Sequence, residues 1–330
     1  MVAAVIFGPE ERRVTPWERD FFRDVDPWGF ILFARNVDSP DQLCRLTADL
    51  RAAVGREAPI LIDQEGGRVQ RMRAPLWRDY LPALDQMALA RDPLRAQWLR
   101  NRLIAEELHA VGIDVNCAPL ADLVEEATHP VLRNRLYGAD VATVVAAARA
   151  CAAGLLAGGV LPVLKHIPGY GRAAVDSHHD LPRVSAPRAA LDARDFAPFR
   201  ALCDMAMGMT AHIVFDAIDA GAPATTSPAM MRVIREDIGF AGLIMTDDLS
   251  MQALSGTLAE RAAASLAAGC DVVLHCNGIP ADMMQVAGAT APLSALATGR
   301  AAAALAQRHT PDPVDTKALA AELDALLEGA

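Results

Sequence analysis

The side chains that could do chemistry are concentrated in one segment, residues 164–182, which reads LKHIPGYGRAAVDSHHDLP. The segment follows a short apolar run typical of a buried strand, and its prolines and glycines prevent a regular helix. We therefore predict a loop that begins with Lys165 and His166. Farther along, His178 stands two residues after Asp176, and an imidazole paired with a carboxylate can transfer a proton near neutral pH. A solvated acidic loop without a role would have the same composition, so the loop alone leaves both interpretations open.

Other ionisable or polar residues also stand at the ends of apolar runs. Asp63 follows the run at residues 59–62, and Asp247 and Asp248 follow the run at residues 242–246. A carboxylate at the end of a rigid strand suits a nucleophile or a base, and Lys or Arg can bind hydroxyls, an amide carbonyl or an anionic group. Helix caps and surface charge would explain any one of these residues, but they explain the whole set poorly. The remaining members are Arg71, Asn116, Asp122, Arg133, Arg135, His212 and Asp216.

A repeated unit must position these residues: a short apolar run, a polar or Gly/Pro turn, and then an Ala- and Leu-rich helical pattern. Runs that are apolar throughout predict strands of a parallel sheet that is buried on both faces. Eight such units in 330 residues favour a closed α/β barrel, the (β/α)8 or TIM barrel, over an open doubly wound sheet. The carboxyl ends of its strands would meet at one mouth. The predicted strands are residues 3–7, 29–33, 59–62, 113–117, 160–164, 207–215, 242–246 and 270–276.

Caps and periodicity indicate where the helices begin. Ser39-Pro40 and Ser227-Pro228 each place a capping hydroxyl before a first-turn proline. Helical patterns cover residues 93–111, 140–156 and 258–268, and Ala/Leu-rich helices follow from 283 to 327 around a break at 310–313. No linker or low-complexity tract divides the chain. We therefore expect a single barrel domain over residues 1–330, with extra C-terminal helices in residues 283–330 packed on the barrel.

Composition and charge limit the partners. Hydrophobic residues make up 52% and charged residues 22% of the chain, which describes a globular protein with a large core. The formal net charge of −10 argues against nucleic acid or an anionic membrane as the main partner. The N-terminal apolar run is too short for a signal peptide, and no apolar run reaches the length of a membrane span. Six separated cysteines without CxxC spacing favour a reducing cytoplasm. We expect a soluble, cytoplasmic monomer that acts on a small molecule.

Cofactor motifs are missing from the sequence. No GxGxxG follows a strand and GxxxxGK[ST] is absent, so nothing supports a nucleotide cofactor. His178 and His179, with Asp176 and Asp180, could in principle hold a metal ion. These ligands share one Gly-rich loop, however, and neither HExxH nor an HxH pair after the first strand is present. We expect no cofactor and no metal, and a metal-dependent barrel hydrolase stays an alternative.

Four motifs together resemble a known family. They are IDQEGGRVQR at 62–71, the KHIPGYGRAAVDSHHDLP loop at 165–182, PATTSP at 223–228 and MTDDLSM at 245–251. In this order they are similar to the bacterial β-N-acetylhexosaminidases of glycoside hydrolase family 3, in the short form that recycles peptidoglycan. The resemblance covers nearly the whole chain, from GFILFARN to CDVVLHCN. It implies an enzyme that removes terminal N-acetylglucosamine from GlcNAc-anhydroMurNAc muropeptides.

The resemblance also implies roles for single residues. Asp247 matches the nucleophile that forms a glycosyl-enzyme, His178 matches the acid/base on the loop, and Asp176 matches the carboxylate paired with that histidine. The reaction would be a retaining double displacement through oxocarbenium-like transition states. Asp248 is expected to be a structural acid near a helix start. The residues that match sugar contacts are Asp63, Arg71, Arg135, Lys165 and His166.

Two features leave questions open. Tyr170 stands where the family loop usually has the His of PGHG, and Tyr cannot become cationic near pH 7. We expect activity to survive, with altered loop packing or pH dependence. Arg135 is preferred over Arg133 as the sugar contact because it precedes Leu136-Tyr137-Gly138. Transfer of the sugar to phosphate instead of water, and sugar binding without turnover, stay alternatives.

Overall fold

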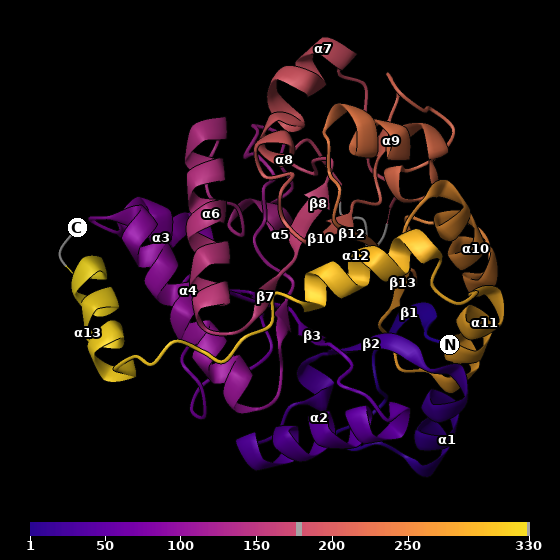
Figure 1. Ribbon diagram of the computed structural model, residues 1–330. Coiled ribbons are helices and arrows are strands. Elements are labelled where there is room, and N and C mark those ends of the chain that lie inside the picture. The colour runs from indigo at the N-terminus through magenta and orange to yellow at the C-terminus, as the bar shows by residue number, and fades with distance from the viewer. Residues whose placement is uncertain (176–179, 329–330) are drawn as a thin grey trace.

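A ring of short parallel strands forms the centre of the computed structural model, which describes residues 1–175 and 180–328 (Figure 1). In chain order the strands of the ring are β1 (Ala3–Phe7), β2 (Pro27–Leu32), β3 (Ile60–Ile62), β6 (Val115–Asn116), β7 (Leu161–Pro162), β8 (Leu164–Ile167), β10 (Met207–Thr210), β12 (Leu243–Asp248) and β13 (Val272–His275). Their order in the sheet is β7-β6-β3-β2-β1-β13-β12-β10-β8. The consecutive segments β7 and β8 are separated only at Val163. Because β7 pairs with β6 and β8 pairs with β10, this one extended run closes the ring, and the predicted (β/α)8 barrel is confirmed.

The side chains of the barrel strands alternate between two apolar cores. Ile6 and Leu61 point into the barrel, where Met207 and Met245 belong to the same buried cluster. The neighbouring side chains on the strands, such as Phe7, point outward and pack under the helices. Because both faces of each strand are covered, nearly every strand position is apolar, as parallel sheets require.

Helices cover the outside of the barrel, and their starts follow the predicted caps. Ser39 accepts a hydrogen bond from the backbone N–H of Gln42, and Ser227 accepts one from that of Met230. The first helices are α1 (Pro16–Val25), α2 (Pro40–Val54), α3 (Ala83–Leu89), α4 (Pro93–Ala110), α5 (Pro130–Arg133), α6 (Val141–Ala157) and α7 (Arg188–Ala190). They are followed by α8 (Ala197–Ala201), α9 (Pro228–Arg232), α10 (Leu258–Ala268), α11 (Pro280–Ala289), α12 (Ala295–Leu305) and α13 (Thr316–Leu327). Short 3-10 or π-helical turns cover Ala34–Asn36, Leu191–Asp195, Ala224–Thr226 and Val233–Asp237.

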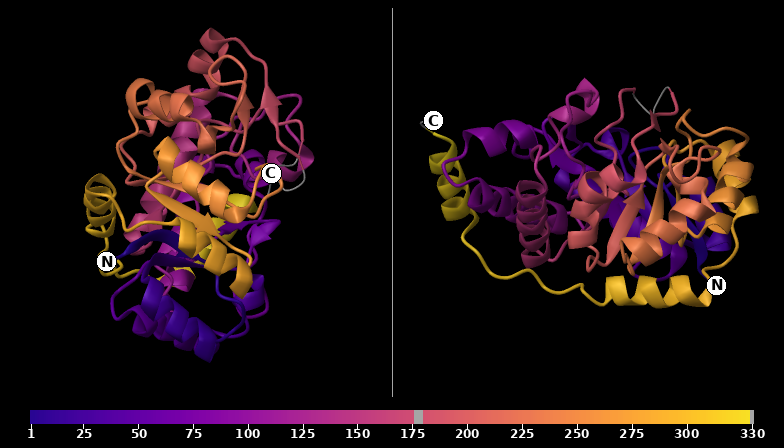
Figure 2. Two further views of the ribbon diagram at one scale, coloured as in Figure 1. Left: turned by 90° about the vertical axis from the view of Figure 1, so that its right-hand side faces the viewer. Right: turned by 90° about the horizontal axis from the view of Figure 1, so that it is seen from above.

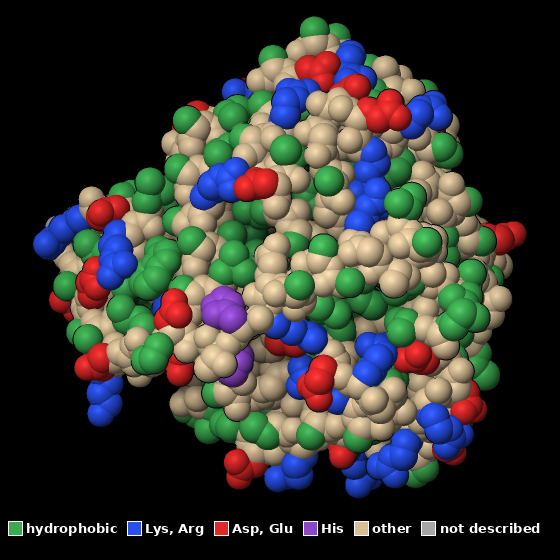
Figure 3. All heavy atoms as spheres, in the orientation of Figure 1, with side chains coloured by type: hydrophobic (Ala, Val, Ile, Leu, Met, Phe, Trp, Pro, Cys, Tyr) green, Lys and Arg blue, Asp and Glu red, His purple; other side chains and the backbone are tan. Residues whose placement is uncertain are grey.

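The C-terminal helices α12 and α13 cover apolar surface, the first at one end of the barrel and the second beside α4. α12 crosses the amino-terminal end of the barrel, away from the predicted mouth, and Ala301 and Ala304 join the cluster inside the barrel (Figures 1 and 2). An extended link follows α12. In this link the backbone oxygen of Asp312 accepts a hydrogen bond from Arg102, and Arg308 pairs with Asp114. The last helix, α13, then packs against α4. On the face that α12 covers, acidic and basic side chains are intermixed (Figure 3). No helix within the described residues is both long and apolar enough to cross a membrane.

Some predicted strands have other limits in the structure. The run at 113–117 keeps only Val115–Asn116 in the sheet, and the run at 207–215 divides into β10 and a separate strand, β11 (Val214–Phe215). β11 leaves the barrel and pairs with β9 (Arg183–Val184), which follows the predicted loop. Two further strands, β4 (Gln64–Gly66) and β5 (Val69–Gln70), form a hairpin after β3 that the sequence analysis did not predict. Gly66 and Gly67 have φ angles of 99° and 57°, which glycine adopts at no steric cost.

Candidate active site

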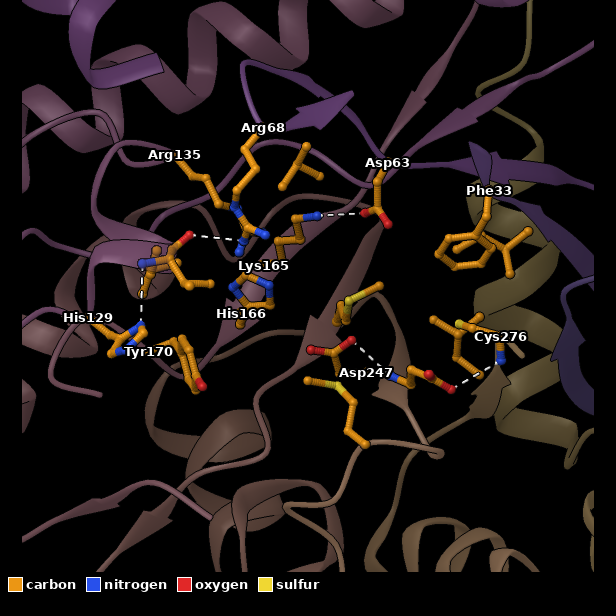
Figure 4. Close-up of a pocket in the computed structure, with 18 of the residues that line it drawn as sticks. Phe33, Asp63, Arg68, His129, Arg135, Lys165, His166, Tyr170, Asp247 and Cys276 are labelled. Carbon is orange, nitrogen blue, oxygen red and sulfur yellow. Dashed lines mark hydrogen bonds and ion pairs between the residues drawn. The ribbon is translucent and has the colours of Figure 1, made fainter. Parts of the chain in front are cut away.

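A cavity of about 210 Å³ lies at the carboxyl ends of the barrel strands. Figure 4 shows Asp63, Lys165, His166 and Asp247 around the same space, although Asp63 follows β3, Lys165 and His166 lie on β8, and Asp247 lies on β12. The structure therefore brings together the described residues for which the sequence predicted a nucleophile or sugar contacts. All six of them line the cavity: Asp63, Arg71, Arg135, Lys165, His166 and Asp247.

The hairpin β4–β5 explains why Arg71 stands beside Asp63. It reverses the chain directly after β3, so that Arg71 Nη2 lies 3.0 Å from Asp63 Oδ2. Gln64 secures the turn, because its side-chain oxygen accepts hydrogen bonds from the backbone N–H groups of Arg71 and Met72. The guanidinium of Arg71 also lies over the ring of Phe33, 5.2 Å from its centroid. The arginine is thus held at the rim between an anion and an aromatic face.

Asp63 is also paired with Lys165 from β8. The ammonium Nζ lies 2.9 Å from Asp63 Oδ1, and the lysine side chain is only 2% exposed. Burial raises the pKa of the Asp63 carboxyl, but Lys165 and Arg71 outweigh burial and hold that pKa well below its usual range. Asp63 is therefore a carboxylate whose oxygens can accept hydrogen bonds from hydroxyl groups.

Glu65 is a site residue that the sequence analysis missed. Its carboxylate accepts two hydrogen bonds of 2.8 Å from the Nε and Nη2 of Arg135, and it lies 2.7 Å from Lys165 Nζ. Burial raises its pKa, but Arg135 and Lys165 outweigh burial and lower the pKa to about 2. Burial likewise works to lower the pKa of Lys165, while Asp63 and Glu65 raise it above its usual value. A signal was present in the sequence, since Glu65 belongs to the DQEGGRV motif two residues after Asp63.

These pairs form one chain of alternating charges across the cavity. It runs from Arg71 through Asp63, Lys165 and Glu65 to Arg135, so three cations hold two carboxylates and one positive charge is left over. Such buried ion pairs hold their members in one geometry, because removing Asp63 or Glu65 would take away the carboxylate with which Arg71 or Arg135 pairs. The chain can therefore present both donors and acceptors to a polyhydroxyl ligand.

Asp122 binds the imidazole ring of His166. Its ring Nδ1 lies 2.8 Å from Asp122 Oδ2, and Asp122 Oδ1 also accepts a 2.6 Å hydrogen bond from the backbone N–H of Tyr170. The ring of Tyr170 lies beside His166, with the two centroids 5.7 Å apart. Asp122 was predicted only as a strand-end residue, and it does not itself line the cavity.

Asp247 and Asp248 stand next to each other but face different surroundings. Both residues line the cavity, and the Oδ1 of Asp247 accepts a hydrogen bond from the backbone N–H of Asp248 at 2.8 Å. The Asp248 carboxylate instead accepts hydrogen bonds from the backbone N–H groups of Ser250 and Cys276, and from the Ser250 hydroxyl. Its contacts hold the backbone after β12 against the end of β13, as expected of a structural acid.

The other strand-end residues lie outside the cavity lining. His212 is buried between Thr225 and the backbone oxygen of Asp248, and burial lowers its pKa although Asp247 acts in the opposite direction. Asp216 pairs with Arg183 and Ser185 at the surface, and Asn116 exchanges hydrogen bonds with the backbone of Gln64. Arg133 is bound to the backbone oxygen of Glu125, so only Arg135 of the two weighed arginines reaches the cavity.

The predicted loop is anchored beside the cavity at its start. The hydroxyl of Thr128 donates to the backbone oxygen of Gly171, and the backbone N–H of His129 donates to that of Ala173. Tyr170 and Val175 line the cavity. Asp176 and His178, the predicted acid/base pair, lie outside the described residues.

Other residues were not singled out in the sequence. Arg68 and His129 line the cavity (Figure 4). Arg68 donates a hydrogen bond to the backbone oxygen of Val131, and the Nδ1 of His129 accepts one from the backbone N–H of Val131. Within residues 1–175 and 180–328, no group of three or more His, Cys, Asp or Glu could hold a metal ion. The residues of the metal alternative include Asp176, His178 and His179, which are not among those described. All six cysteines are described and free.

Comparison with known proteins places this geometry in a family. The model of the glycosyl hydrolase family 3 N-terminal domain matches residues 20–307. The β-hexosaminidase of Alkalilimnicola ehrlichii is 40% identical over 287 residues, which cover 84% of this chain and 81% of that protein. The β-hexosaminidase of Methylococcus capsulatus is 39% identical over 277 residues, 82% of this chain and 81% of that protein. The crystal structure of NagZ from Neisseria gonorrhoeae in complex with N-trifluoroacetyl-D-glucosamine has a TM-score of 0.85 at 32% identity, with 98% of each chain covered.

The match to the family model extends over most of the barrel, and the similarity to the relatives extends over most of their length. The structural similarity extends over the whole of both chains apart from a few residues. This chain therefore belongs to glycosyl hydrolase family 3, and within that family it is a hydrolase of the β-hexosaminidase type.

Proposed function

We propose that the protein is a retaining exo-β-N-acetylglucosaminidase with Asp247 as its nucleophile. The observation that carries this proposal is that the Asp247 carboxylate shares one small cavity with the buried chain of charges from Arg71 to Arg135. Carbohydrate hydroxyls need convergent donors and acceptors, which this chain supplies, and the reacting carbon needs a carboxylate at the same place. A surface cluster of acids would offer only the second of these.

The size of the cavity favours action at a chain end. Its volume of about 210 Å³ is smaller than the ~300 Å³ at which typical small-molecule sites begin. A cavity of this size suits one sugar ring and leaves no room for a second residue beyond it. We therefore place the terminal, non-reducing sugar in the cavity, with Asp63, Lys165 and His166 as hydroxyl contacts and Arg71 and Arg135 as further contacts.

The proposed reaction has two displacements. In the first, a carboxylate oxygen of Asp247 forms a bond to the anomeric carbon while the bond from that carbon to the aglycone oxygen breaks. His178 gives its proton to the departing oxygen, and Asp176 stabilises the imidazolium through its negative charge. In the second, His178 takes a proton from water, the water oxygen bonds to the anomeric carbon, and Asp247 is released. The roles of His178 and Asp176 rest on the family resemblance of their loop.

We further propose that the natural substrates are muropeptides that carry N-acetylglucosamine on anhydro-N-acetylmuramic acid. The support is the similarity to bacterial β-hexosaminidases over most of the chain and to NagZ over nearly all of it. Such fragments would be processed in the cytoplasm, and six free cysteines suit that compartment. Transfer to phosphate is the competing reaction, because a histidine acid/base repels an anionic acceptor less than a carboxylate would.

The proposal is tested by turnover of p-nitrophenyl N-acetyl-β-glucosaminide with the product anomer followed by NMR. Release of the β-anomer first supports retention, and first release of the α-anomer overturns it. A fluorinated substrate that slows hydrolysis of the glycosyl-enzyme should leave a sugar on Asp247, located by mass spectrometry of peptides. A label on another residue would reject Asp247 as the nucleophile. Adding phosphate should leave the product unchanged for a hydrolase, and a chelator should leave the rate unchanged.

A further inference from the structure

Asp122 makes contacts that no role in the proposed reaction explains. Its side chain is fully buried and accepts hydrogen bonds from His166 and Tyr170, which both line the cavity. Oδ2 lies 2.8 Å from the ring Nδ1 of His166, and the backbone N–H of His166 lies 3.3 Å and 3.4 Å from the two carboxylate oxygens. Oδ1 accepts the backbone N–H of Tyr170 at 2.6 Å. A buried carboxylate with three N–H donors is fully used inside the protein.

The contact with Nδ1 decides which ring nitrogen of His166 carries the hydrogen. A carboxylate can only accept, so Nδ1 must be the donor, and in a neutral imidazole the other nitrogen is then an acceptor. Within the described part of the chain, Nε2 of His166 makes no hydrogen bond, and the ring lines the cavity. The lone pair of Nε2 is therefore available to a group bound there.

We propose that Asp122 is a positioning residue that fixes the Nδ1–H tautomer of His166, so that Nε2 accepts a hydrogen bond from a sugar hydroxyl. The identity of the ligand rests on the proposed function, while the tautomer does not. Lys165 and Arg71 flank the Asp63 carboxylate and supply hydrogen-bond donors. Asp63 is one acceptor for a hydroxyl hydrogen, and Nε2 of His166 gives the cavity a second. Without Asp122 both tautomers would be accessible, and the Nε2–H form would turn the acceptor into a donor.

The substitution Asp122→Asn separates this role from support of the backbone. The amide oxygen can keep the position of Oδ1 and accept the N–H groups of Tyr170 and His166. The amide nitrogen then replaces Oδ2 and donates to Nδ1, which forces the hydrogen of the imidazole onto Nε2. The variant keeps the shape of the side chain and inverts the hydrogen-bonding character that His166 presents to the cavity.

Nitrogen NMR of protein labelled with 15N-histidine tests the tautomer without any activity. We expect the wild-type His166 signal, assigned by its loss in His166→Gln, to show a protonated Nδ1 and an unprotonated Nε2 at neutral pH, and Asp122→Asn to show the reverse. A wild-type ring protonated on Nε2, alone or together with Nδ1, would overturn the proposal. The wild-type spectrum decides this even if Asp122→Asn does not fold.

Kinetics test whether Asp122 acts through His166. Asp122→Asn should lower kcat/KM about 10- to 100-fold, mainly by raising KM, because a contact to bound substrate is lost. In a His166→Ala background the same change should cost less than about 3-fold, since coupled residues do not add. If the losses in kcat/KM of the two single variants multiplied in the double variant, Asp122 would act independently of His166, which would refute the positioning role. Asp204→Asn is the matched control, because the ion pair that Asp204 forms with Arg149 is exposed. If no variant or wild type turns over substrate while the NMR result holds, the proposed function fails and the tautomer assignment stands.

Discussion

The ammonium of Lys165 lies between the carboxylates of Asp63 and Glu65, 2.9 Å from the first and 2.7 Å from the second. The two acids follow β3 and the lysine lies on β8, and the sheet brings them together because only β6 separates β3 from β7, the segment that β8 continues. The side chains of Lys165 and Glu65 are 2% and 5% exposed, so the charge of each is stabilised by the other instead of by water. This relationship underlies the first prediction.

Replacing Glu65 by Gln should destabilise the protein and weaken substrate binding. The change leaves Lys165 and Arg135 facing a neutral amide, and removing one partner of a buried ion pair costs about 3–5 kcal/mol. Urea unfolding of the variant measures the loss, and KM for the aryl glycoside should rise. Glu322→Gln is the control, since Glu322 forms an exposed pair with Arg95 and its loss should cost less than about 1 kcal/mol. Equal stability of the two variants would contradict the importance of the buried pair.

Replacing Asp247 by Asn should abolish turnover and leave the fold intact. Among the described residues, the carboxylate accepts one hydrogen bond, from the adjacent backbone N–H of Asp248, which an amide oxygen can also accept. We expect kcat to fall by at least about 10³-fold, because no other group can take the place of a covalent nucleophile. Thermal unfolding should be unchanged within a few degrees. Residual activity within 10-fold of the wild type would exclude Asp247 from the covalent step.

Stability should fall as the pH rises through the range in which Glu107 ionises. Burial raises the pKa of this carboxyl to about 7, against the backbone N–H of Arg78, the Tyr80 hydroxyl and the charge of Arg78. The folded protein therefore binds more protons than the unfolded chain between about pH 4.5 and 7, and the free energy of unfolding decreases across that interval.

The substitution Glu107→Gln tests this dependence. The variant should be more stable than the wild type by roughly 1–2 kcal/mol at pH 8 and should lose that advantage near pH 4. Urea unfolding at both pH values measures the difference. Glu106→Gln is a matched control on the same helix, because Glu106 is half exposed and paired with Arg102. An advantage for Glu107→Gln that is the same at both pH values would show that ionisation of Glu107 is not its cause.

Adding a methyl group at Gly171 should disturb the start of the loop. A Cβ at this position would lie 2.0 Å from the backbone oxygen of Leu123, so one of the two segments must move. The movement would strain the hydrogen bonds from Thr128 to Gly171 and from Tyr170 to Asp122. We expect Gly171→Ala to lower kcat/KM at least about 10-fold.

Gly221→Ala is the control for that measurement. The nearest atom to a Cβ at Gly221 is 3.5 Å away, so the added methyl group meets no obstacle. This variant should keep wild-type kcat/KM. Equal activity of Gly171→Ala and Gly221→Ala would show that close packing against Leu123 does not hold the loop in its active arrangement.

Much of the fold could be read from the sequence because it depends on local patterns. Apolar runs such as Ala3–Phe7 predict strands buried on both faces, and capping residues such as Ser39 predict where helices begin. Asp63 and Asp247 were found as candidate site residues because each closes an apolar run, and the rule that such ends share one mouth needs no coordinates. The family motifs predicted Arg71, Arg135, Lys165 and His166 as their neighbours.

Only the tertiary structure decided which polar groups face one another. Glu65 belongs to the DQEGGRV motif and Asp122 follows an apolar run, but neither local pattern identifies the partners of these acids, which lie on another strand. The neighbours Asp247 and Asp248 are likewise alike in sequence and both line the cavity, and only the packing of β12 against β13 engages the Asp248 carboxylate with the backbone N–H of Cys276. The sequence by itself determined the elements and the kinds of chemistry at their ends, because both depend on near neighbours in the chain. The pairing of charges between β8 and the residues that follow β3 had to come from the tertiary structure, because burial and the distance between segments far apart in the chain set it.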